Sequence, residues 1–198
     1  MAGGAPKVKR HTVVALVEDK PGVLNRIVSL FRRRGFNIVS LTVGPSEMPE
    51  LSRLTIVVGG DTVSVEQVVK QLYKLIEVIK VNDISEEEMV ARELALIKVA
   101  AADSRRLEIM HIVQVYQGKI LDMSPDSLII EMTGAEDKIE SFVQVLRPFG
   151  IKEMVRTGRA AMVRGSVVSA KLPEEVVHIF RGMPSKADLR RMGGGPGT

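Results

Sequence analysis

Hydrophobic and polar positions follow two spacings along the chain, and the same succession of spacings occurs twice. Residues 12–17 are almost continuously apolar, which predicts a buried strand, and in residues 22–34 the apolar side chains recur at helical spacing. The pattern then predicts a hairpin, a second helix and a closing strand, at residues 36–44, 51–59, 64–76 and 79–84. The first half is therefore expected to run strand, helix, strand, strand, helix, strand.

The same order returns after an acidic run at residues 85–88. The predicted elements of this half cover residues 94–101, 104–116, 118–123, 127–133, 135–146 and 151–156. Two tandem βαββαβ units are the ferredoxin-like pattern repeated, so we expect an α+β fold with two antiparallel sheets, each with its helices on one face. The expected division is an N-terminal extension (1–10), a first domain (11–84), a linker (85–93), a second domain (94–165) and a basic, largely flexible tail (166–198).

Two of the predicted strands are apolar on both faces. They comprise residues 12–17 and 54–58. Because both helices of such a unit pack on one face of its sheet, the opposite face needs a second layer or a partner. We therefore expect a dimer or a larger assembly.

Composition narrows the function by exclusion. The 198 residues carry a net charge of +4, and the basic excess lies beyond residue 155, so it is weak evidence for a nucleic-acid partner of the folded body. Cysteine is absent, which removes disulfides and thiolate chemistry, and only 4% of the residues are aromatic. With no apolar run long enough to span a membrane, we expect a cytoplasmic protein without nucleic-acid or membrane partners.

The chain offers no pattern typical of catalysis. His11, His111 and His178 lie far apart, and none has a second ligand at i+3 or i+4 that would indicate a metal site. The sequence contains no nucleophile elbow and no glycine-rich phosphate loop before a helix. The three consecutive arginines at residues 32–34 are better explained as a solvated helix C-terminus than as a phosphate contact. We therefore predict a non-catalytic protein without a cofactor or metal of its own.

One turn does favour a ligand. Asp19, Lys20, Pro21 and Gly22 join the first strand to the first helix, where Pro21 presets φ and Gly22 lets a ligand approach the backbone. Backbone N–H groups at a helix N-terminus suit a carboxylate, and Asp19 could accept a hydrogen bond from an ammonium group.

Three apolar residues and one amide complete the candidate site. Asn37, at the start of the adjacent strand, offers a donor and an acceptor, and Val23, Leu24 and Ile38 would seat a small branched side chain. A free apolar amino acid has these features. Spacing alone favours this interpretation no more than an ordinary strand-to-helix turn with Asp19 near the cap and Pro21 at the first helical position.

The residues around this turn also carry a resemblance. Residues 16–26 resemble the signature of ACT domains, which bind amino acids as regulatory ligands. Residues 31–44 are similar to the small regulatory subunits of acetolactate synthase (acetohydroxyacid synthase). Further similar stretches are residues 51–56, 71–78, 90–99 and 118–122, so that the resemblance runs from about Lys9 to Gly165.

The resemblance implies a regulatory subunit without an active site, which activates a large catalytic subunit in valine, leucine and isoleucine biosynthesis. That partner is expected to carry thiamine diphosphate, magnesium and FAD. The resemblance also implies feedback inhibition by valine, bound between the ACT domains of a homodimer. The implied effector site takes Asp19, Gly22, Val23 and Leu24 from one chain and Asn37 and Ile38 from the other.

Asp19 departs from the family, which commonly has asparagine at that position, and this leaves the choice of effector open. An ACT-domain sensor that regulates a different enzyme is the alternative, because the turn alone is typical of ACT domains in general. An acylphosphatase-like activity is disfavoured, because its phosphate loop needs an arginine where this chain has Asp19 and Lys20.

Overall fold

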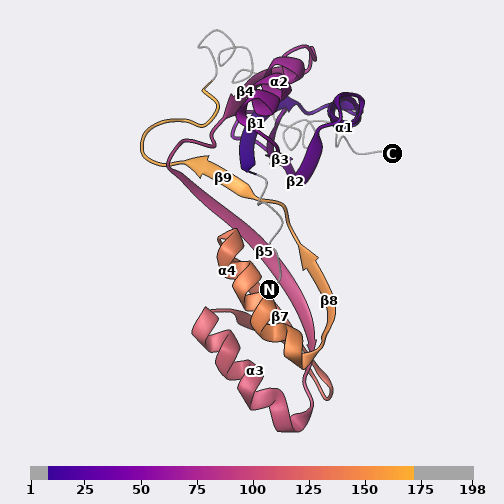
Figure 1. The fold of residues 1–198 in the computed structure, drawn as a ribbon, viewed down its shortest axis with the longest axis vertical. Helices are drawn as coiled ribbons and strands as arrows, with labels where there is room; N and C mark the ends of the chain where they lie inside the picture. The colour runs from indigo at the N-terminus through magenta and orange to yellow at the C-terminus, as the bar shows by residue number, and fades with distance from the viewer. Residues whose placement is uncertain (1–8, 172–198) are drawn as a thin grey trace, which may run out of the picture. The chain divides into compact units, whose positions relative to one another are not determined.

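A computed structural model describes residues 9–171 of the chain (Figure 1). These residues form two compact units, one of residues up to Met89 together with the described residues from Ala161, and one of Val90–Ala160. The first unit contains β1 (Arg10–Glu18), α1 (Val23–Arg34), β2 (Asn37–Pro45), β3 (Leu51–Gly59), α2 (Thr62–Leu72) and β4 (Val78–Asp83). The strands and helices follow the predicted βαββαβ order.

The second half repeats that order. Its elements are β5 (Met89–Ala100), α3 (Asp103–Tyr116), β6 (Lys119–Ser124), β7 (Ser127–Gly134), α4 (Glu136–Leu146), a 3-10 turn (Arg147–Phe149) and β8 (Ile151–Arg156). The last strand, β9 (Ala160–Val163), belongs to the first unit from Ala161 onward. The predicted α+β class, with two ferredoxin-like units, is confirmed.

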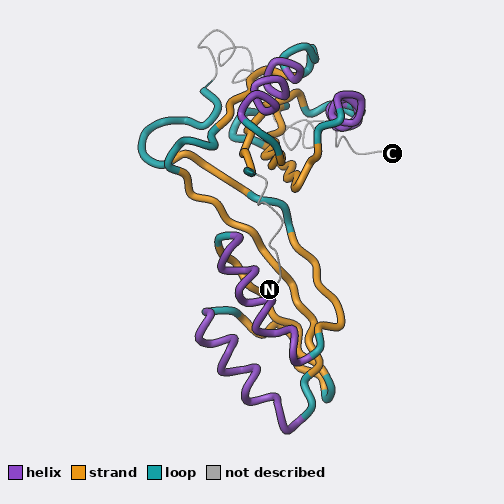
Figure 2. The backbone as a smooth tube through the Cα atoms, viewed as in Figure 1, coloured by secondary structure: helices purple, strands orange, loops and turns teal. Residues whose placement is uncertain are grey.

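Each unit contains both strands and helices (Figure 2). Both sheets are antiparallel and have equivalent strand orders. The first sheet runs β2-β3-β1-β4 and the second runs β6-β7-β5-β8, with β9 pairing with β5 off this path. In each sheet the first strand of the unit therefore lies in the interior, and the strand after the first helix lies at an edge. This order decides which site residues can meet within one chain.

The core of the first unit lies between its sheet and its two helices. Val13, Ala15 and Val17 alternate along β1 and pack in one cluster with Ile27 and Phe31 of α1, all buried. Burial of such side chains contributes roughly 1.5–3 kcal/mol each. The second unit has a corresponding core between its sheet and α3 and α4, with Phe142 completely buried.

The opposite face of the first sheet is also buried. Val14 and Leu16 point away from the helices, yet they are 0% and 1% exposed. Arg53, opposite Leu16 on β3, donates from Nη2 to the Ala161 carbonyl at 2.9 Å, and Asn82, opposite Val14 on β4, donates to the Ser169 carbonyl at 2.7 Å. The chain's own C-terminal segment, residues 161–171, therefore contacts the face for which a partner was expected.

The domain limits differ from the prediction at several points. Residues 161–165, expected in the second domain, belong to the first unit. Strand β5 begins at Met89, so residues 89–93 of the expected linker belong to a strand. Within this strand Glu93 is buried, and its Oε2 accepts from Arg156 Nη2 at 2.7 Å. Residues 166–171 of the expected tail belong to the first unit, and residues 1–8 and 172–198 lie outside the described part.

Candidate functional site

The candidate ligand turn follows β1 and ends at Gly22, the N-cap residue of α1. Gly22 has φ 89° and ψ −14°, in the left-handed region that glycine adopts without strain. A Cβ built on Gly22 would meet nothing within 4 Å, so the space above the turn is open. The turn thus needs glycine for its conformation and leaves room for a ligand beside the backbone.

The N-terminus of α1 is suited to an anion. No side chain caps this helix, and no acidic residue lies in its first turn. The first N–H groups of a helix have no partners within it, and the helix dipole adds roughly 0.3–1 kcal/mol for a negative charge placed there. A carboxylate bound at this end would accept hydrogen bonds from N–H groups that have no acceptor within the helix.

The turn is held in place by backbone hydrogen bonds and by ion pairs beside it. The Asp19 N–H donates to the Glu50 carbonyl at 2.8 Å, and Arg26 Nη1 donates to Glu77 Oε1 at 2.6 Å. Lys20 Nζ lies 2.8 Å from Glu18 Oε2, and this hydrogen bond raises the pKa of Lys20. Lys20 and Arg26 therefore each face a carboxylate, and the Asp19 side chain is exposed at the turn.

The apolar side chains near the turn divide into core and surface. Val23 is 6% exposed and belongs to the core, whereas Leu24 is 43% exposed on the outside of α1. Val28, one helical turn further on, is 41% exposed, and residues four apart lie on the same helix face. Leu24 and Val28 both belong to the apolar spacing of residues 22–34, and only the folded unit shows that they are exposed.

Asn37 and Ile38 lie at the other end of the sheet. Glu18, at the end of β1, is opposite Leu51 on β3, whereas Asn37 is opposite Gly59, eight residues further along the same strand. At roughly 3.3 Å per residue the two ends are about 26 Å apart. Within a single chain Asn37 does not lie beside the turn. This corrects the expectation that its place at the start of the adjacent strand would put it there.

The chain connection explains this separation. Strands β1 and β2 are both antiparallel to β3, so they are parallel to each other, with α1 as the crossover between them. A crossover returns the chain to the end of the sheet where the first strand began. Asn37 therefore starts β2 near the start of β1, while the turn follows the end of β1.

Strand β2 forms the edge of the sheet. Its outer side chains include Val39 and Val43, which are 40% and 43% exposed, and its register shifts between Ile38 and Ser40. An edge strand presents unpaired N–H and C=O groups that another strand can use. Asn37 and Ile38 lie at the beginning of this open edge.

Within residues 9–171 no group of three or more histidine, aspartate or glutamate side chains is arranged to hold a metal ion. His11 is buried beside Asp83, with Nδ1 3.9 Å from Oδ2, and His111 is exposed on α3. His178 lies outside the described residues. In the same part of the chain no helix has the length and apolarity needed to cross a membrane.

Comparisons with known proteins match both units. The family described as the small subunit of acetolactate synthase matches residues 92–165, and the AHAS small subunit-like ACT domain matches residues 14–80. A probable acetolactate synthase small subunit from Archaeoglobus fulgidus is 57% identical over 157 residues, which are 79% of this chain and 98% of the relative. An acetolactate synthase small subunit from Mycobacterium bovis is 48% identical over 157 residues, 79% of this chain and 94% of the relative.

A solved structure is similar as well. The crystal structure of the acetolactate synthase small subunit from Thermotoga maritima has a TM-score of 0.75 and 48% identity, over 81% of this chain and 100% of that one.

Proposed function

The chain belongs to the acetolactate synthase small-subunit family, and we propose that it activates the large catalytic subunit and makes that enzyme sensitive to feedback inhibition by valine. Family membership supports a regulatory ACT-domain protein. The observation that carries the effector site is the open, uncapped N-terminus of α1 at Gly22.

A second copy of the chain would complete the site. If two β2 edges pair antiparallel about a two-fold axis near Leu41, Asn37 of one chain lies near Gly44 and Pro45 of the other. Within one chain Pro45 lies opposite Ser52 on β3. Ser52 follows Leu51, which lies opposite Glu18 at the end of β1. Such pairing therefore brings Asn37 and Ile38 to the end of the sheet that holds the second copy's turn.

The chemistry of the assembled site matches an apolar amino acid. The ligand carboxylate would accept from the first N–H groups of α1, and its ammonium group would donate to Asp19 and to the Asn37 amide oxygen. Leu24 and Val28, exposed on one face of α1, and Ile38 from the other chain would contact a small branched side chain. Valine has this size and charge pattern.

Ligand binding at this place would act through the pairing of the two chains. A ligand that contacts both copies favours the arrangement in which both halves of the site meet, and such coupling is typically about 1–3 kcal/mol. The thiamine diphosphate, magnesium and FAD of the holoenzyme belong to the catalytic subunit in this proposal. Isoleucine and leucine production would be controlled together with valine production.

An ACT-domain sensor for a different enzyme is less well supported. The turn alone would fit such a sensor. The match of residues 92–165 to the small-subunit family, however, covers a second unit that ACT domains in general do not carry. Co-purification of this chain with a thiamine-diphosphate enzyme would separate the two possibilities.

The substitution Gly22→Asp tests the site. It places a carboxylate beside the position of the ligand carboxylate, so we expect valine inhibition of the reconstituted holoenzyme to be abolished while activation is retained. Gly165→Asp is the matched control, because Gly165 also has a positive φ (77°) and open space around its Cβ position.

Two measurements decide the outcome. Acetolactate formation is followed with and without valine, and calorimetry measures valine binding to each variant with glutamate as the comparison ligand. A Gly22→Asp holoenzyme that is still fully inhibited by valine would show that the effector binds elsewhere. Failure of the wild-type chain to activate the catalytic subunit would refute the regulatory proposal itself.

A further inference from the structure

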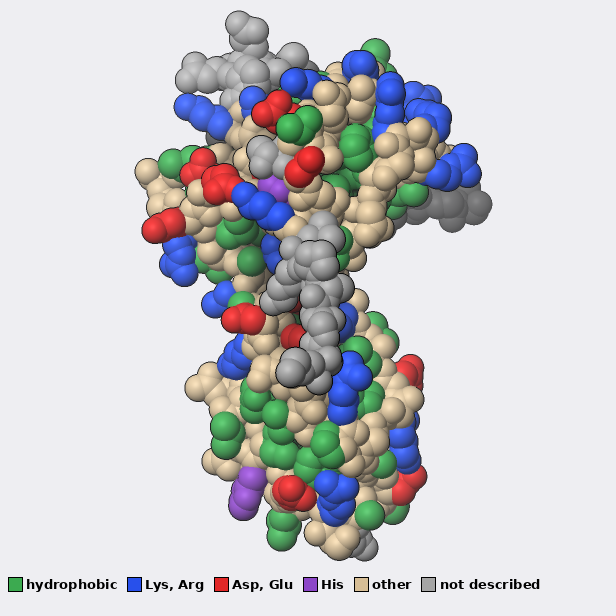
Figure 3. All heavy atoms as spheres, in the orientation of Figure 1, with side chains coloured by type: hydrophobic (Ala, Val, Ile, Leu, Met, Phe, Trp, Pro, Cys, Tyr) green, Lys and Arg blue, Asp and Glu red, His purple; other side chains and the backbone are tan. Residues whose placement is uncertain are grey.

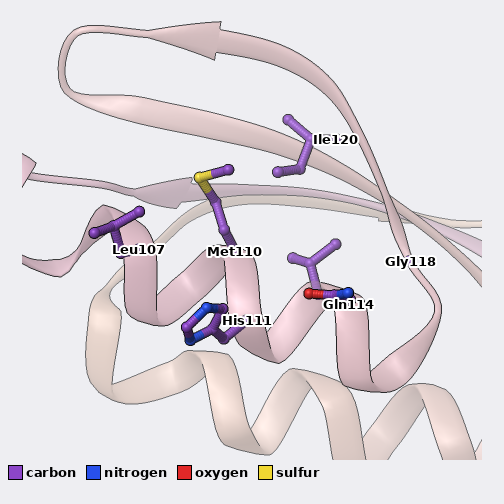
Figure 4. A pocket seen from close by; sticks show the side chains of 7 residues that line it. Leu107, Met110, His111, Gln114, Gly118 and Ile120 are labelled. Atoms are coloured by element: carbon purple, nitrogen blue, oxygen red, sulfur yellow. The ribbon is translucent and has the colours of Figure 1, made fainter.

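A groove of about 450 Å³ lies between α3 and the beginning of β6 in the second unit. Met110 points from the helix toward the strand, and Ile120 points from the strand toward the helix (Figure 4). Hydrophobic side chains gather over the region of α3 in the space-filling view (Figure 3). The polar side chains in the lining, His111 and Gln114, are exposed, whereas a ligand pocket holds its ligand with a few convergent polar groups. The groove therefore does not indicate a ligand.

The two edges of the first sheet differ from each other. The strand order is β2-β3-β1-β4, so β2 and β4 each have a neighbouring strand on one side only. An edge strand presents N–H and C=O groups to which a further strand can bind. On β2 the side chains of Val39 and Val43 are exposed, whereas the apolar residues of β4, Val78, Ile79 and Val81, are buried or half-buried. The apolar surface for a second copy therefore lies at β2.

The Tyr73 hydroxyl occupies the outer side of β4. It donates to the Val81 carbonyl at 2.9 Å and accepts from the Val81 N–H at 3.2 Å. Val81 lies opposite Ala15 on β1, and in an antiparallel ladder the N–H and C=O of one residue point to the same side. Because both groups of Val81 bond to Tyr73, they point away from β1. They are the groups with which Val81 would bind a further strand.

The end of α2 holds Tyr73 in this position. Leu72, the last residue of the helix, is completely buried, and the Tyr73 N–H donates to the Val69 carbonyl at 3.2 Å. The chain then turns back to β4 through two more backbone hydrogen bonds, from Leu75 to Leu72 and from Val78 to Leu75, each 3.0 Å long. Tyr73 is 46% exposed, so it lies at the surface beside the strand edge and not in the core.

We propose that the Tyr73 hydroxyl closes the β4 edge to a further strand, so that the first units of this chain pair edge to edge through β2 alone. A unit with two open edges adds a copy at each and builds an open-ended sheet, whereas a unit with one open edge forms a closed pair about a two-fold axis. Closure of β4 thus limits edge pairing to two copies. The restriction to β2 pairs rests on the proposed function, but the closure itself depends only on Tyr73.

The substitution Tyr73→Phe tests the closure, because it removes the hydroxyl and keeps the ring. Full-length wild-type and variant chains are compared by sedimentation equilibrium and by hydrogen exchange at the Val81 amide. At low concentration we expect this amide to exchange about 2- to 12-fold faster in the variant, because a net hydrogen bond is lost. At high concentration we expect the weight-average mass to rise about twofold or more above wild type, and Val81 to regain protection, as β4 edges pair.

Tyr116→Phe is the matched control. The Tyr116 hydroxyl bonds to the Ser141 side chain at 2.8 Å, so its removal frees no backbone group of a strand. We expect this variant to behave as wild type in both measurements. A Tyr73→Phe chain with the wild-type mass at every concentration would overturn the proposal. A rise in mass that leaves Val81 unprotected would also overturn it, because the copies would then associate elsewhere.

The same measurements separate this proposal from the proposed function. If wild-type chains stay monomeric while Tyr73→Phe chains pair, the closure of β4 is supported and the β2 pairing of the proposed function is refuted. If the wild-type holoenzyme is inhibited by valine while Tyr73→Phe leaves the mass unchanged, the proposed function stands and the closure of β4 is refuted.

Discussion

Substitution of Ser169 tests whether the C-terminal segment is a packed part of the first unit. The Ser169 hydroxyl accepts from the Val163 N–H at 2.9 Å, and Ser169 is 4% exposed. Ser169→Ala leaves this buried N–H without a partner, which typically costs about 1–3 kcal/mol. Its carbonyl, which accepts from Asn82, is unchanged, so the substitution isolates one hydrogen bond.

Hydrogen exchange at the Val163 amide measures this cost locally. A loss of about 1–3 kcal/mol corresponds to exchange about 5- to 150-fold faster when exchange follows opening of the segment. Ser166→Ala is the control, because Ser166 is exposed in the same segment and surface substitutions usually change stability by less than about 0.5 kcal/mol. Equal exchange rates at Val163 in both variants would refute the packing of this segment on the sheet.

Two further predictions concern the stability of the two units. Phe142→Ala removes a completely buried ring that lies 5.0 Å from the Tyr116 ring, so we expect the unfolding free energy of the second unit to fall by about 3–5 kcal/mol in urea denaturation, with Gln144→Ala nearly neutral. Asp61 accepts from the Ser64 N–H at 2.8 Å at the start of α2. Hydrogen bonding from the Ser64 side chain, and secondly from this N–H, lowers the pKa of Asp61. The pKa of Asp61 is lower in the folded protein than in the unfolded chain. Ionised Asp61 therefore stabilises the fold fully at pH values above the unfolded-state pKa, and this stabilisation is lost as the pH falls through the folded-state pKa. Thermal unfolding of Asp61→Asn, which keeps the acceptor, should lack this pH dependence, and an unchanged profile would contradict the assignment.

The proposed effector site is divided between two copies by the topology of the first unit. Because β1 and β2 are parallel and joined by α1, Gly22 and Asn37 necessarily lie at opposite ends of one sheet. A ligand that contacts both residues would therefore bind only where two chains associate. This arrangement would make an amino acid at the turn a regulator of assembly without any movement inside a single unit.

Much of the fold was predictable from local patterns. The continuous apolar run in β1, the helical spacing of α1 and the glycine after the strand each depend on a few neighbouring residues. Gly22 was singled out by its place between strand and helix, and its φ of 89° lies in the left-handed region that favours glycine. The order of elements then follows because consecutive elements pack as a ferredoxin-like unit.

The remaining features depend on residues that are distant in sequence. The charge of Glu93 inside β5 is offset by Arg156, 63 residues away, and no local pattern shows that pairing. The second face of the first sheet suggested a partner because two of its strands are apolar on both faces, and the segment that contacts this face carries no clear periodic pattern that would have identified it. The segment contacts the sheet through the carbonyl groups of Ala161 and Ser169. Because every residue has such a carbonyl, the sequence of the segment does not indicate these contacts.

The sequence by itself determined the class of fold, the two repeated units and the turn at Gly22, because each rests on the periodicity and backbone preferences of adjacent residues. Only the tertiary structure decided that Asn37 lies about 26 Å from that turn, at roughly 3.3 Å per strand residue, and that β2 and β6 are edges. Only the tertiary structure also decided that the C-terminal segment contacts the first sheet through Arg53 and Asn82. Strand order and register are set by packing between distant segments, and no local pattern contains them.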